Sequence, residues 1–524
     1  MASSAQSGAI IRPQPAVRRA EPEAQGRQDV TEYGVRRLLI LIGVMAATLM
    51  QTLDGTITNV ALPAIQGNLG ASQDEATWVV TGYTIAAITV IPLTPWLQNR
   101  FGRKRYYLAS IIGFTIASVA CGRSTTLPFL VFWRVVQGAF GGGLLATSQA
   151  ILRDTFPPSQ LGLSQAIFAI GAIMGPSLGP PLGGILVDNA TWNLCFDINV
   201  GPGLISSLLL FFLLRDPTAP RRTPVDFLGL ALLATAIATL QYIITEGERH
   251  YWLADPTIDV MLVICIFSTA AFIWYELHGT NDPIVDLRIF ANRSVAAGSL
   301  LAFALGSVVF GSTYTIPQVT QGPLGFTATL SGMLFILRAA PIALVTPFAA
   351  RLAGSVDVRW LLGAGFLTVA FGTAILALVT TPISDFWTFA PSLIITGIGV
   401  AFLFTPLSIA VLRATTPSEG PKAGAMVNLA TQLGGSISIA FLDVVVDRRM
   451  MFHSEVLQGS VVRARPPIEQ FLAAHGSVTQ LAQIVGTQAA VLAYADATWL
   501  MAGAAAICTP LVLLMRRPRK GAAG

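Results

Sequence analysis

Two opposite charges lie within long apolar stretches of this chain, where charged side chains are rare. Asp54 follows LLILIGVMAATLMQTL, and Arg134 lies within LPFLVFWRVVQGAF. A charge in such a stretch is costly unless it is paired or faces water, so each is a candidate functional residue. A partly desolvated carboxylate can take up and release a proton, and a nearby guanidinium would compete with that proton. We single out Asp54 and Arg134 as a proton-binding pair; the alternative for Asp54 is a hydrogen bond in helix packing.

Two further charges are secondary candidates. Arg338 lies near the middle of one apolar stretch, and Asp443 lies nearer the end of another. Arg338 binds an anionic group of the substrate, pairs with an acid such as Asp443, or has a purely structural role. The sequence does not choose between these interpretations. None of the four His lies deep in such a stretch, which leaves carboxylates as the titrating groups. The four Cys show no paired spacing, so we expect no disulfide framework, metal site or cofactor.

The composition shows which solvent surrounds these charges. Of 524 residues, 53% are hydrophobic and 11% are charged, whereas soluble proteins are about 25% charged. A chain this apolar cannot cover itself with a polar surface, so it must use lipid as part of its solvent. The net charge of +5 comes from basic residues scattered between apolar runs, which argues against nucleic-acid binding.

Fourteen stretches are long enough to cross a membrane as helices. A hydrocarbon layer of about 30 Å needs roughly 20 apolar residues. The predicted spans are 38–60, 76–97, 106–122, 128–150, 160–186, 197–214, 226–245, 258–276, 295–316, 329–350, 360–379, 386–411, 423–446 and 493–515.

Lys and Arg predict how these spans are oriented, because loops on the cytoplasmic side carry an excess of both. With the N-terminus inside, the inside segments hold 24 of the 32 Lys and Arg, and the outside loops hold six. We therefore expect a multi-pass protein of the inner (plasma) membrane with both termini in the cytoplasm.

A weak internal repeat divides the spans into two halves. The basic turns at 97–105 and 352–360 follow corresponding spans, which is typical of two parallel six-helix repeats. The expected segments are a disordered cytoplasmic tail at 1–37, a first six-helix half at 38–214, a linker with two extra spans at 215–294, a second half at 295–515 that includes an outer loop at 447–492, and a cytoplasmic tail at 516–524.

The fifth span is unusually rich in Gly and Pro. Gly171, Gly175 and Gly179 recur every four residues and would form one smooth face that lets another helix approach closely. Prolines interrupt the backbone hydrogen bonds of a helix and should bend it. Those in this span are Pro176, Pro180 and Pro181. We expect a kinked, tightly packed helix at a moving interface.

Several motifs, taken in order, resemble those of a known family. LDGTITNVALPAI (53–65) matches a first-span motif, RVVQGAFGGG (134–143) an arginine motif, and 171–184 the antiporter motif of exporters. The stretches 191–203 and 406–440 resemble later spans. From about residue 38 to 515, the chain is similar to the major facilitator superfamily, specifically the bacterial fourteen-span drug:proton antiporters of the EmrB/QacA type. The resemblance implies an all-α integral membrane protein with two six-helix halves plus two extra helices.

The resemblance also assigns roles. It gives the proton-coupling role to Asp54 and Arg134. The antiporter motif falls on Gly171, Gly175, Pro176, Gly179, Gly183 and Gly184. The cytoplasmic loop motif falls on Arg100, Gly102, Arg103 and Lys104. As candidates for a substrate cavity we take Gln51, Thr56, Gln137, Tyr314, Asn428 and Gln432.

The chain departs from the family pattern at three positions. Pro95 and Asn99 stand where the family has Gly and Asp, and Asn193 stands where Arg is usual. The missing acid at 99 weakens any gating model based on an aspartate salt bridge in that loop.

These features favour a transporter. No convergent catalytic set within the spans indicates an enzyme, and no selectivity element indicates a channel. The chain has no GxxxxGK[ST] loop, so direct ATP use is not expected. We expect a proton-coupled antiporter that exports small amphipathic compounds, drugs or toxic metabolites, by alternating access. The alternative is a single-component exporter of a specific metabolite or siderophore.

The outer loop at 447–492 bears on protein partners. Apolar residues recur in it at helical spacing. They include Ile468, Phe471, Leu472, Leu481, Ile484 and Val485. Resemblance to EmrB-like pumps of Gram-negative bacteria implies a periplasmic membrane-fusion adaptor and an outer-membrane channel, whereas a solvated cap that touches nothing is the alternative. The other expected partners are the small-molecule substrate, protons and membrane lipid.

Overall fold

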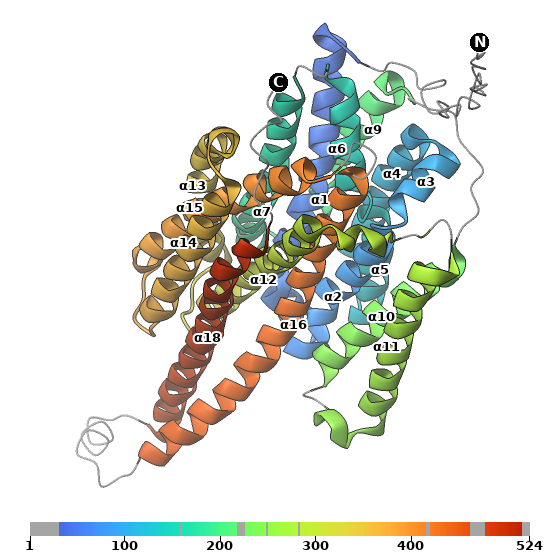
Figure 1. The fold of residues 1–524 in the computed structure, drawn as a ribbon. Helices are drawn as coiled ribbons and strands as arrows, with labels where there is room; N and C mark the ends of the chain where they lie inside the picture. Colours follow the sequence, from blue (N-terminus) through green and yellow to red (C-terminus); the bar gives the residue numbers. More distant parts are fainter. Residues whose placement is uncertain are drawn as a thin grey trace, which may run out of the picture.

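The chain folds into a bundle of helices (Figure 1). The computed structural model describes residues 31–515 except 158–159, 217–225, 248–249, 281–282, 284, 416–419 and 462–476. Every regular element in these residues is helical, so the predicted all-α class is confirmed. The predicted tails at 1–37 and 516–524 lie outside the described residues, apart from 31–37.

A first bundle precedes residue 214. Its helices are α1 (Gly34–Leu69), α2 (Gln73–Val90), α3 (Thr94–Phe101), α4 (Arg103–Gly122), α5 (Leu127–Gly141), α6 (Leu144–Thr155), α7 (Leu161–Asn189), α8 (Leu194–Asp197) and α9 (Val200–Leu213). Long α1 packs on α7 and α9, while α2 and α4 both pack on α5. This packing brings residues that are far apart in sequence to the middle of one bundle.

Two predicted spans of the first bundle are broken, at the residues least suited to a helix. The span 76–97 divides into α2 and α3, which meet at 60°, because Pro92 and Pro95 lack the N–H that a continuous helix needs. The span 128–150 is interrupted between α5 and α6 at three consecutive glycines, 141–143, which are poor helix formers, but α5 and α6 together still form one stretch that could cross a membrane.

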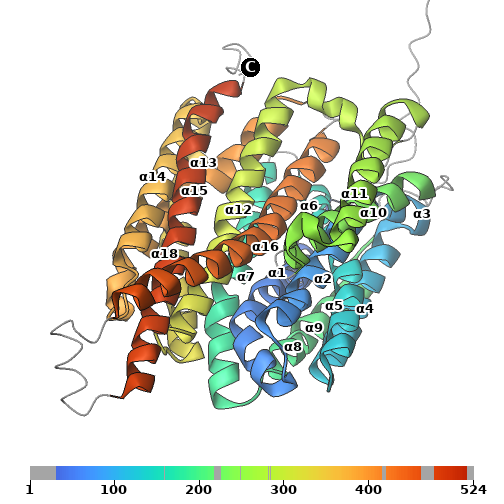
Figure 2. The same ribbon diagram turned by 90° about the horizontal axis from the view of Figure 1, so that it is seen from below.

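A second bundle follows residue 292, and two helices lie between the bundles in sequence. The second bundle contains α12 (Arg293–Gln321), α13 (Ala328–Ser355), α14 (Val358–Val379), α15 (Ala390–Arg413), α16 (Gly420–Ser460) and α18 (Val478–Leu511). The intervening helices are α10 (Phe227–Glu246) and α11 (Pro256–Trp274). Short helical turns are η2 (Trp252–Ala254), η3 (Tyr275–Gly279), η4 (Leu287–Ala291), η5 (Phe386–Phe389) and η6 (Val512–Leu514). Figure 2 shows α13, α14 and α18 on one side and α2, α4 and α5 on the other.

The lengths of these helices agree with most of the predicted spans. Among the described residues, twelve helices are long and apolar enough to cross a membrane, and the bent pair α2–α3 makes a thirteenth. Each corresponds to a predicted span. α7 covers the remaining predicted span, 160–186, but is not counted among them. The number fourteen therefore stays a prediction.

Two helices of the second bundle are much longer than a membrane requires. α16 has 41 residues and α18 has 34, and Figure 1 shows both extending together past the other helices at the lower left. α16 contains the predicted span 423–446, and α18 contains residues 493–511 of the predicted span 493–515. Both helices extend beyond these spans into the outer loop, where α16 continues to Ser460 and α18 begins at Val478. We call residues 447–460 and 478–492 the outer hairpin. Of the helical positions expected in this loop, those at 481–485 lie in α18, and those at 468–472 lie outside the described residues.

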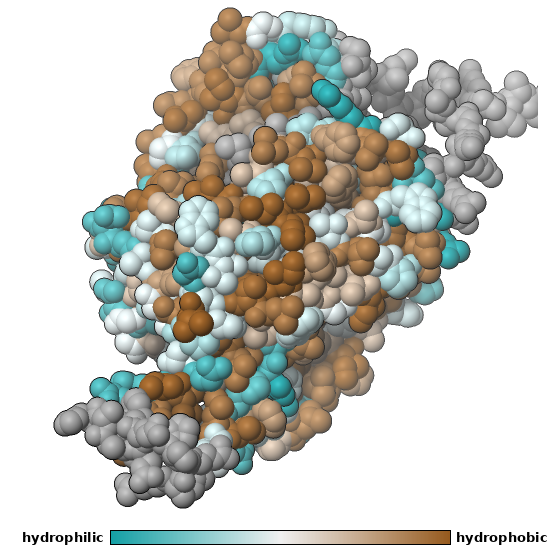
Figure 3. Space-filling model, turned by 90° about the vertical axis from the view of Figure 1, so that its left-hand side faces the viewer, coloured by the Kyte–Doolittle hydropathy of each residue, from teal (hydrophilic) through white to brown (hydrophobic). Residues whose placement is uncertain are grey.

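On the face shown in Figure 3, apolar residues, in brown, cover much of the bundle between pale and teal ones. Leu344 on α13, Phe371 on α14 and Ile507 on α18 all expose more than half of their side chains. A soluble protein rarely exposes large apolar patches. These surfaces are suited to lipid.

Candidate functional site

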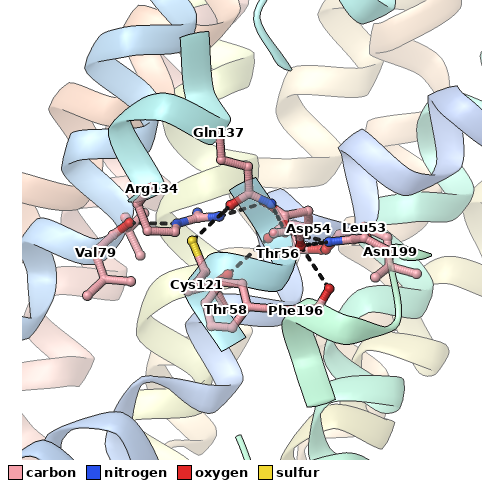
Figure 4. Close-up of polar contacts among 12 residues, drawn as sticks. Leu53, Asp54, Thr56, Thr58, Val79, Cys121, Arg134, Gln137, Phe196 and Asn199 are labelled. Carbon is pink, nitrogen blue, oxygen red and sulfur yellow. Dashed lines mark hydrogen bonds and ion pairs between the residues drawn. The ribbon is translucent and has the colours of Figure 1, made fainter. Parts of the chain in front are cut away.

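Asp54 and Arg134 form an ion pair in the middle of the first bundle (Figure 4). Asp54 lies on α1, and Arg134 lies 80 residues later on α5. The Arg134 Nη1 to Asp54 Oδ2 distance is 2.7 Å, and the two side chains are 1% and 0% exposed. The two charges that the sequence analysis singled out therefore lie in direct contact.

Both ends of the ion pair have further hydrogen-bond partners. Gln137, one turn after Arg134 on α5, donates from Nε2 to Asp54 Oδ1 at 2.9 Å. Asn199, at the start of α9, donates from Nδ2 to the same oxygen at 2.8 Å. Arg134 donates from Nε to the carbonyl of Val79 at 2.9 Å and from Nη1 to Gln137 Oε1 at 2.7 Å. A buried charge pair is tolerated when its remaining polar atoms are satisfied in this way.

Two aromatic side chains pack against the Arg134 guanidinium. The Arg134 guanidinium lies 4.2 Å from the centre of the Tyr83 ring and 5.7 Å from that of Phe196, distances at which a ring face attracts a cation. Ser118 on α4 accepts from Asn199 Nδ2 at 2.9 Å and holds this amide in place. Helices α1, α2, α4, α5 and α9 therefore converge on one carboxylate. We call Asp54, Arg134, Gln137 and Asn199 the charge cluster.

The charge cluster surrounds the Asp54 side chain with hydrogen-bond donors. Its side-chain partners Arg134, Gln137 and Asn199 all donate from N–H groups. The Arg134 guanidinium has almost no access to water. Removing the charge of Asp54 would therefore leave a buried guanidinium without a countercharge.

The glycines of α7 form the predicted smooth face. A Cβ added to Gly171, Gly175 or Gly179 would lie within 2.2 Å of a side-chain atom on α1. Gly183 faces Ile57 on α1, and a Cβ on Gly184 would lie 2.2 Å from the carbonyl of Ala328 on α13. The expected close helix approach is confirmed on both flanks of α7. A single helix runs through the three prolines, and the predicted kink stays a prediction.

The two bundles are joined where the end of α7 meets the start of α13, on the side that the distribution of Lys and Arg predicts to be outside. Asp188 Oδ2 accepts the backbone N–H of Thr329 at 2.6 Å, and Oδ1 accepts that of Ala328 at 3.2 Å. A carboxylate at a helix N-terminus satisfies free N–H groups and the helix dipole. Close by, a Cβ on Gly332 would lie 2.2 Å from the carbonyl of Pro180. We call this contact region the outer seam.

Arg338 and Asp443 have different partners. Arg338 donates from Nη1 to Ser312 Oγ at 2.6 Å and from Nη2 to Thr313 Oγ1 at 3.0 Å, both on α12. Asp443 accepts from the Tyr314 hydroxyl at 2.7 Å. All of these groups are buried in the second bundle. They form a second polar region whose role the sequence had left open.

The candidates for a substrate cavity fall into several environments. Gln137 belongs to the charge cluster, and Tyr314 binds Asp443. Thr56 donates to the carbonyl of Leu53 on its own helix and faces Gly179, so it lies in the α1–α7 contact. The other three candidates do not share one environment. Gln51 is buried on α1, whereas Asn428 and Gln432 are half-buried and lie one turn apart on α16.

The cytoplasmic loop motif lies between α3 and α4. Gly102 has φ +87°, a left-handed conformation that favours glycine. Arg103 Nη1 lies 2.8 Å from Asp154 Oδ2 at the end of α6, and the backbone N–H of Lys104 donates to Asp216. Acids from two other segments, Asp154 and Asp216, therefore contact this motif.

Comparison with known proteins identifies this architecture. The family model described as Major Facilitator Superfamily matches residues 44–313 and 296–448. The chain belongs to the major facilitator superfamily. It is 33% identical over 498 residues to the multidrug export protein EmrB of Escherichia coli (strain K12), across 93% of this chain and 96% of that protein. The expected EmrB type is confirmed, and the chain is a transporter.

Two other similarities support the assignment. The chain is 34% identical to the fatty acid resistance protein FarB of Neisseria gonorrhoeae, across 79% of this chain and 82% of that protein. Its fold is similar to the crystal structure of a bacterial homolog of the human lysosomal transporter Spinster in an inward-facing, unoccupied conformation. The TM-score is 0.62 at 16% identity, across 92% of this chain and 98% of that one.

Several functional residues were missed by the sequence reasoning. Asn199 and Tyr83 belong with Asp54, yet an amide or a phenol in an apolar span carries no charge to mark it. Glu246 was also missed, although it is buried on α10 and accepts a 2.6 Å hydrogen bond from Trp78 Nε1. Its place at the last residue of an apolar stretch was the available signal. Asp188 and Asp154 lie at helix ends, where most acids are unremarkable.

Proposed function

We propose that this transporter exports small amphipathic compounds in exchange for protons. The names of its relatives support export: one is a multidrug export protein and another a fatty acid resistance protein. The single observation that carries proton coupling is the Asp54–Arg134 ion pair, fully buried between spans. The inner membrane and cytoplasmic termini are part of this proposal, supported by the distribution of Lys and Arg.

The mechanism is a competition for one carboxylate. With Asp54 ionised, Arg134, Gln137 and Asn199 hold α1, α5 and α9 together. When a proton from the outer side binds Asp54, Arg134 loses its countercharge and must find other acceptors. Arg134 already donates to the carbonyl of Val79 on α2, so its release changes how α2 and α5 pack. Substrate in a cavity between the bundles biases which state is occupied.

Alternating access then requires the bundles to rock against each other. The outer seam between α7 and α13 is the contact that must open for release to the outside. Gly184 and Gly332 let the two backbones meet there with no side chain between them, which favours a contact that forms and separates as a unit. We propose that Asp188 closes this seam and that the Tyr314–Asp443 region responds as a secondary charge site.

The outer hairpin supports the adaptor proposal. Met451, Phe452 and Val456 on α16 and Ile484 on α18 each expose half or more of their side chains. These residues lie beyond the part of each helix that a membrane needs, and a solvated cap does not need exposed apolar residues. We propose that this surface binds a periplasmic membrane-fusion adaptor, which would connect the pump to an outer-membrane channel.

The test of proton coupling uses purified protein in liposomes with an imposed pH gradient and a panel of lipophilic dyes as substrates. Asp54→Asn is expected to bind dye but to lose gradient-driven transport. Asp259→Asn, an exposed acid in the first turn of α11, is the matched control and should pump normally. Normal pumping by Asp54→Asn would refute coupling at this residue and direct the same experiment to Asp443.

A further inference from the structure

A hollow at the surface of the first bundle has an apolar wall and a basic rim. It measures about 490 Å³ and lies where the end of α3, the first turns of α4 and the end of α5 meet. This volume is within the range of small-ligand sites, roughly 300–1,000 Å³. Its apolar wall includes Leu97, Phe101, Ala139 and Phe140, and its basic residues are Arg100 and Arg105.

The two arginines of the rim are available to a ligand. Arg103, in the same turn, is paired with Asp154. Arg100 and Arg105 are exposed, and neither has an ion-pair partner within the described part of the chain. Asn99 beside them brings no negative charge. The rim therefore has a local positive charge that the neighbouring side chains do not neutralise.

The apolar wall continues from this rim along the lipid-facing side of membrane helices. Phe101 is 51% exposed and Phe140 38% exposed, and the spans that contain α4 and α5 are each apolar enough to cross a membrane. α3 is bent by 60° from α2 and packs on α4, so its Leu97, Arg100 and Phe101 form one side of the hollow. A ligand that fits must carry its negative charge at the membrane surface and an apolar chain directed into the membrane.

We propose that this hollow binds an anionic phospholipid, with its phosphate on Arg100 and Arg105 and an acyl chain along Phe101 and Phe140. Basic residues near a membrane surface attract anionic lipids, and Arg forms paired hydrogen bonds with phosphate. On the orientation proposed above, this lipid belongs to the cytoplasmic leaflet. The site itself does not depend on that orientation.

The position of the lipid also connects it to the charge cluster. Ala139 and Phe140 follow Gln137 on α5 by less than one turn, and Val90 of the hollow ends α2, which carries Tyr83 and the carbonyl of Val79. A bound lipid would hold these two helix ends in one arrangement. Transport should therefore be faster in membranes that contain anionic phospholipid.

Binding is tested by native mass spectrometry of the full-length protein with phosphatidylglycerol and with phosphatidylcholine of the same acyl chains. Wild type should retain phosphatidylglycerol preferentially. Arg100→Gln/Arg105→Gln should weaken that retention by roughly tenfold or more, while Arg100→Lys/Arg105→Lys should preserve most of it. The matched control is Arg288→Gln/Arg351→Gln, which removes two exposed arginines elsewhere and should change nothing.

A second variant tests the apolar wall without changing charge. Ala139→Trp would fill the hollow and should also reduce phosphatidylglycerol retention. Two results would overturn the site. One is equal retention of phosphatidylglycerol by wild type and by the Arg100→Gln/Arg105→Gln variant. The other is a loss of retention in the Arg288→Gln/Arg351→Gln control as large as in that variant. Full competition by glycerol phosphate, which has no acyl chain, would also overturn the lipid assignment. A lipid-free pump that still exchanges protons for dye would leave the proposed function intact.

Discussion

Thr52 on α1 faces Gly175 on α7 so closely that a Cβ on the glycine would lie 1.8 Å from the threonine Oγ1. One turn further along α1, Thr56 faces Gly179 in the same way, and a Cβ on that glycine would lie 2.2 Å from the Thr56 Oγ1. Small residues allow helices in membranes to approach until their backbones touch. The four-residue spacing of the glycines thus has a structural purpose: it places one glycine opposite each turn of the helix that carries Asp54.

Filling this contact should reduce transport. Gly175→Leu or Gly179→Leu would force α1 and α7 apart, at a cost of about 1–3 kcal/mol or more for overpacking. We expect normal membrane insertion but strongly reduced dye efflux from cells. Gly363→Leu on α14 is the matched control, because no atom lies within 4 Å of a Cβ there. Normal efflux by both α7 variants would show that this contact does not need to be tight.

The outer seam gives a prediction about conformation. Asp188→Asn removes the charge that caps the N-terminus of α13, and a lost cap costs about 1 kcal/mol. The outer ends should separate more often, which spin labels at Asn68→Cys and Ile383→Cys would detect as longer distances. Asp385→Asn is the control, because Asp385 accepts its hydrogen bonds from Thr388 in the same loop and does not join the bundles.

The pH dependence of that seam has a definite sign. Asp188 is exposed at the outer end of α7, beyond the predicted span 160–186. Its partial burial acts to raise the pKa, but the hydrogen bonds from Thr329 and Ala328 outweigh this and lower it below its ordinary value. At pH values above the ordinary pKa of an aspartate, the charged Asp188 therefore stabilises the seam in full. The seam weakens only as the pH falls through the lowered pKa of Asp188. Distances between the two labels should not change between about pH 5 and 8; a transition there would assign proton sensing to Asp188.

Much of the fold and part of the site could be predicted from the sequence. Apolar length locates spans because lipid cannot hydrogen-bond an exposed backbone. Asp54 and Arg134 were recognisable because charge in such spans is rare. The glycine face of α7 was visible because its spacing of four matches the helix period.

The remaining features depend on contacts that no local pattern encodes. Asn199 reaches Asp54 across 145 residues, and nothing around it distinguishes it from a packing amide. Asp154 pairs with Arg103 of the cytoplasmic loop motif, but it lies on another helix. The sequence also did not indicate where α16 ends, because hydropathy indicates which residues lie in lipid and the helix continues beyond them to Ser460.

The outer hairpin provides a prediction about partners. Deleting residues 455–485 should abolish drug resistance in a Gram-negative host if an adaptor docks there, with little change in efflux by the pump alone in vesicles. Met451→Ser/Ile484→Ser tests the same surface without shortening the helices. Unchanged resistance in both would indicate a passive cap.

The last prediction concerns the energy that couples Asp54 to Arg134. Arg134→Gln leaves a buried carboxylate without its countercharge, and Asp54→Asn leaves a buried guanidinium, so each should destabilise the protein by about 3–5 kcal/mol. The double variant should lose clearly less than the sum, since neither charge is then left unpaired. Thermal unfolding of purified protein in detergent measures this difference as Tm shifts.

Arg123 and Asp197 are the control pair, because their nitrogen–oxygen distance of 2.8 Å is close to the 2.7 Å of the buried pair but Arg123 is 64% exposed. Their coupling should be only about 0–1 kcal/mol. The competition mechanism requires that removing the charge of Asp54 changes the state of Arg134. Additive effects at Asp54 and Arg134 would mean that the two residues act independently, and protonation of one could not move the other.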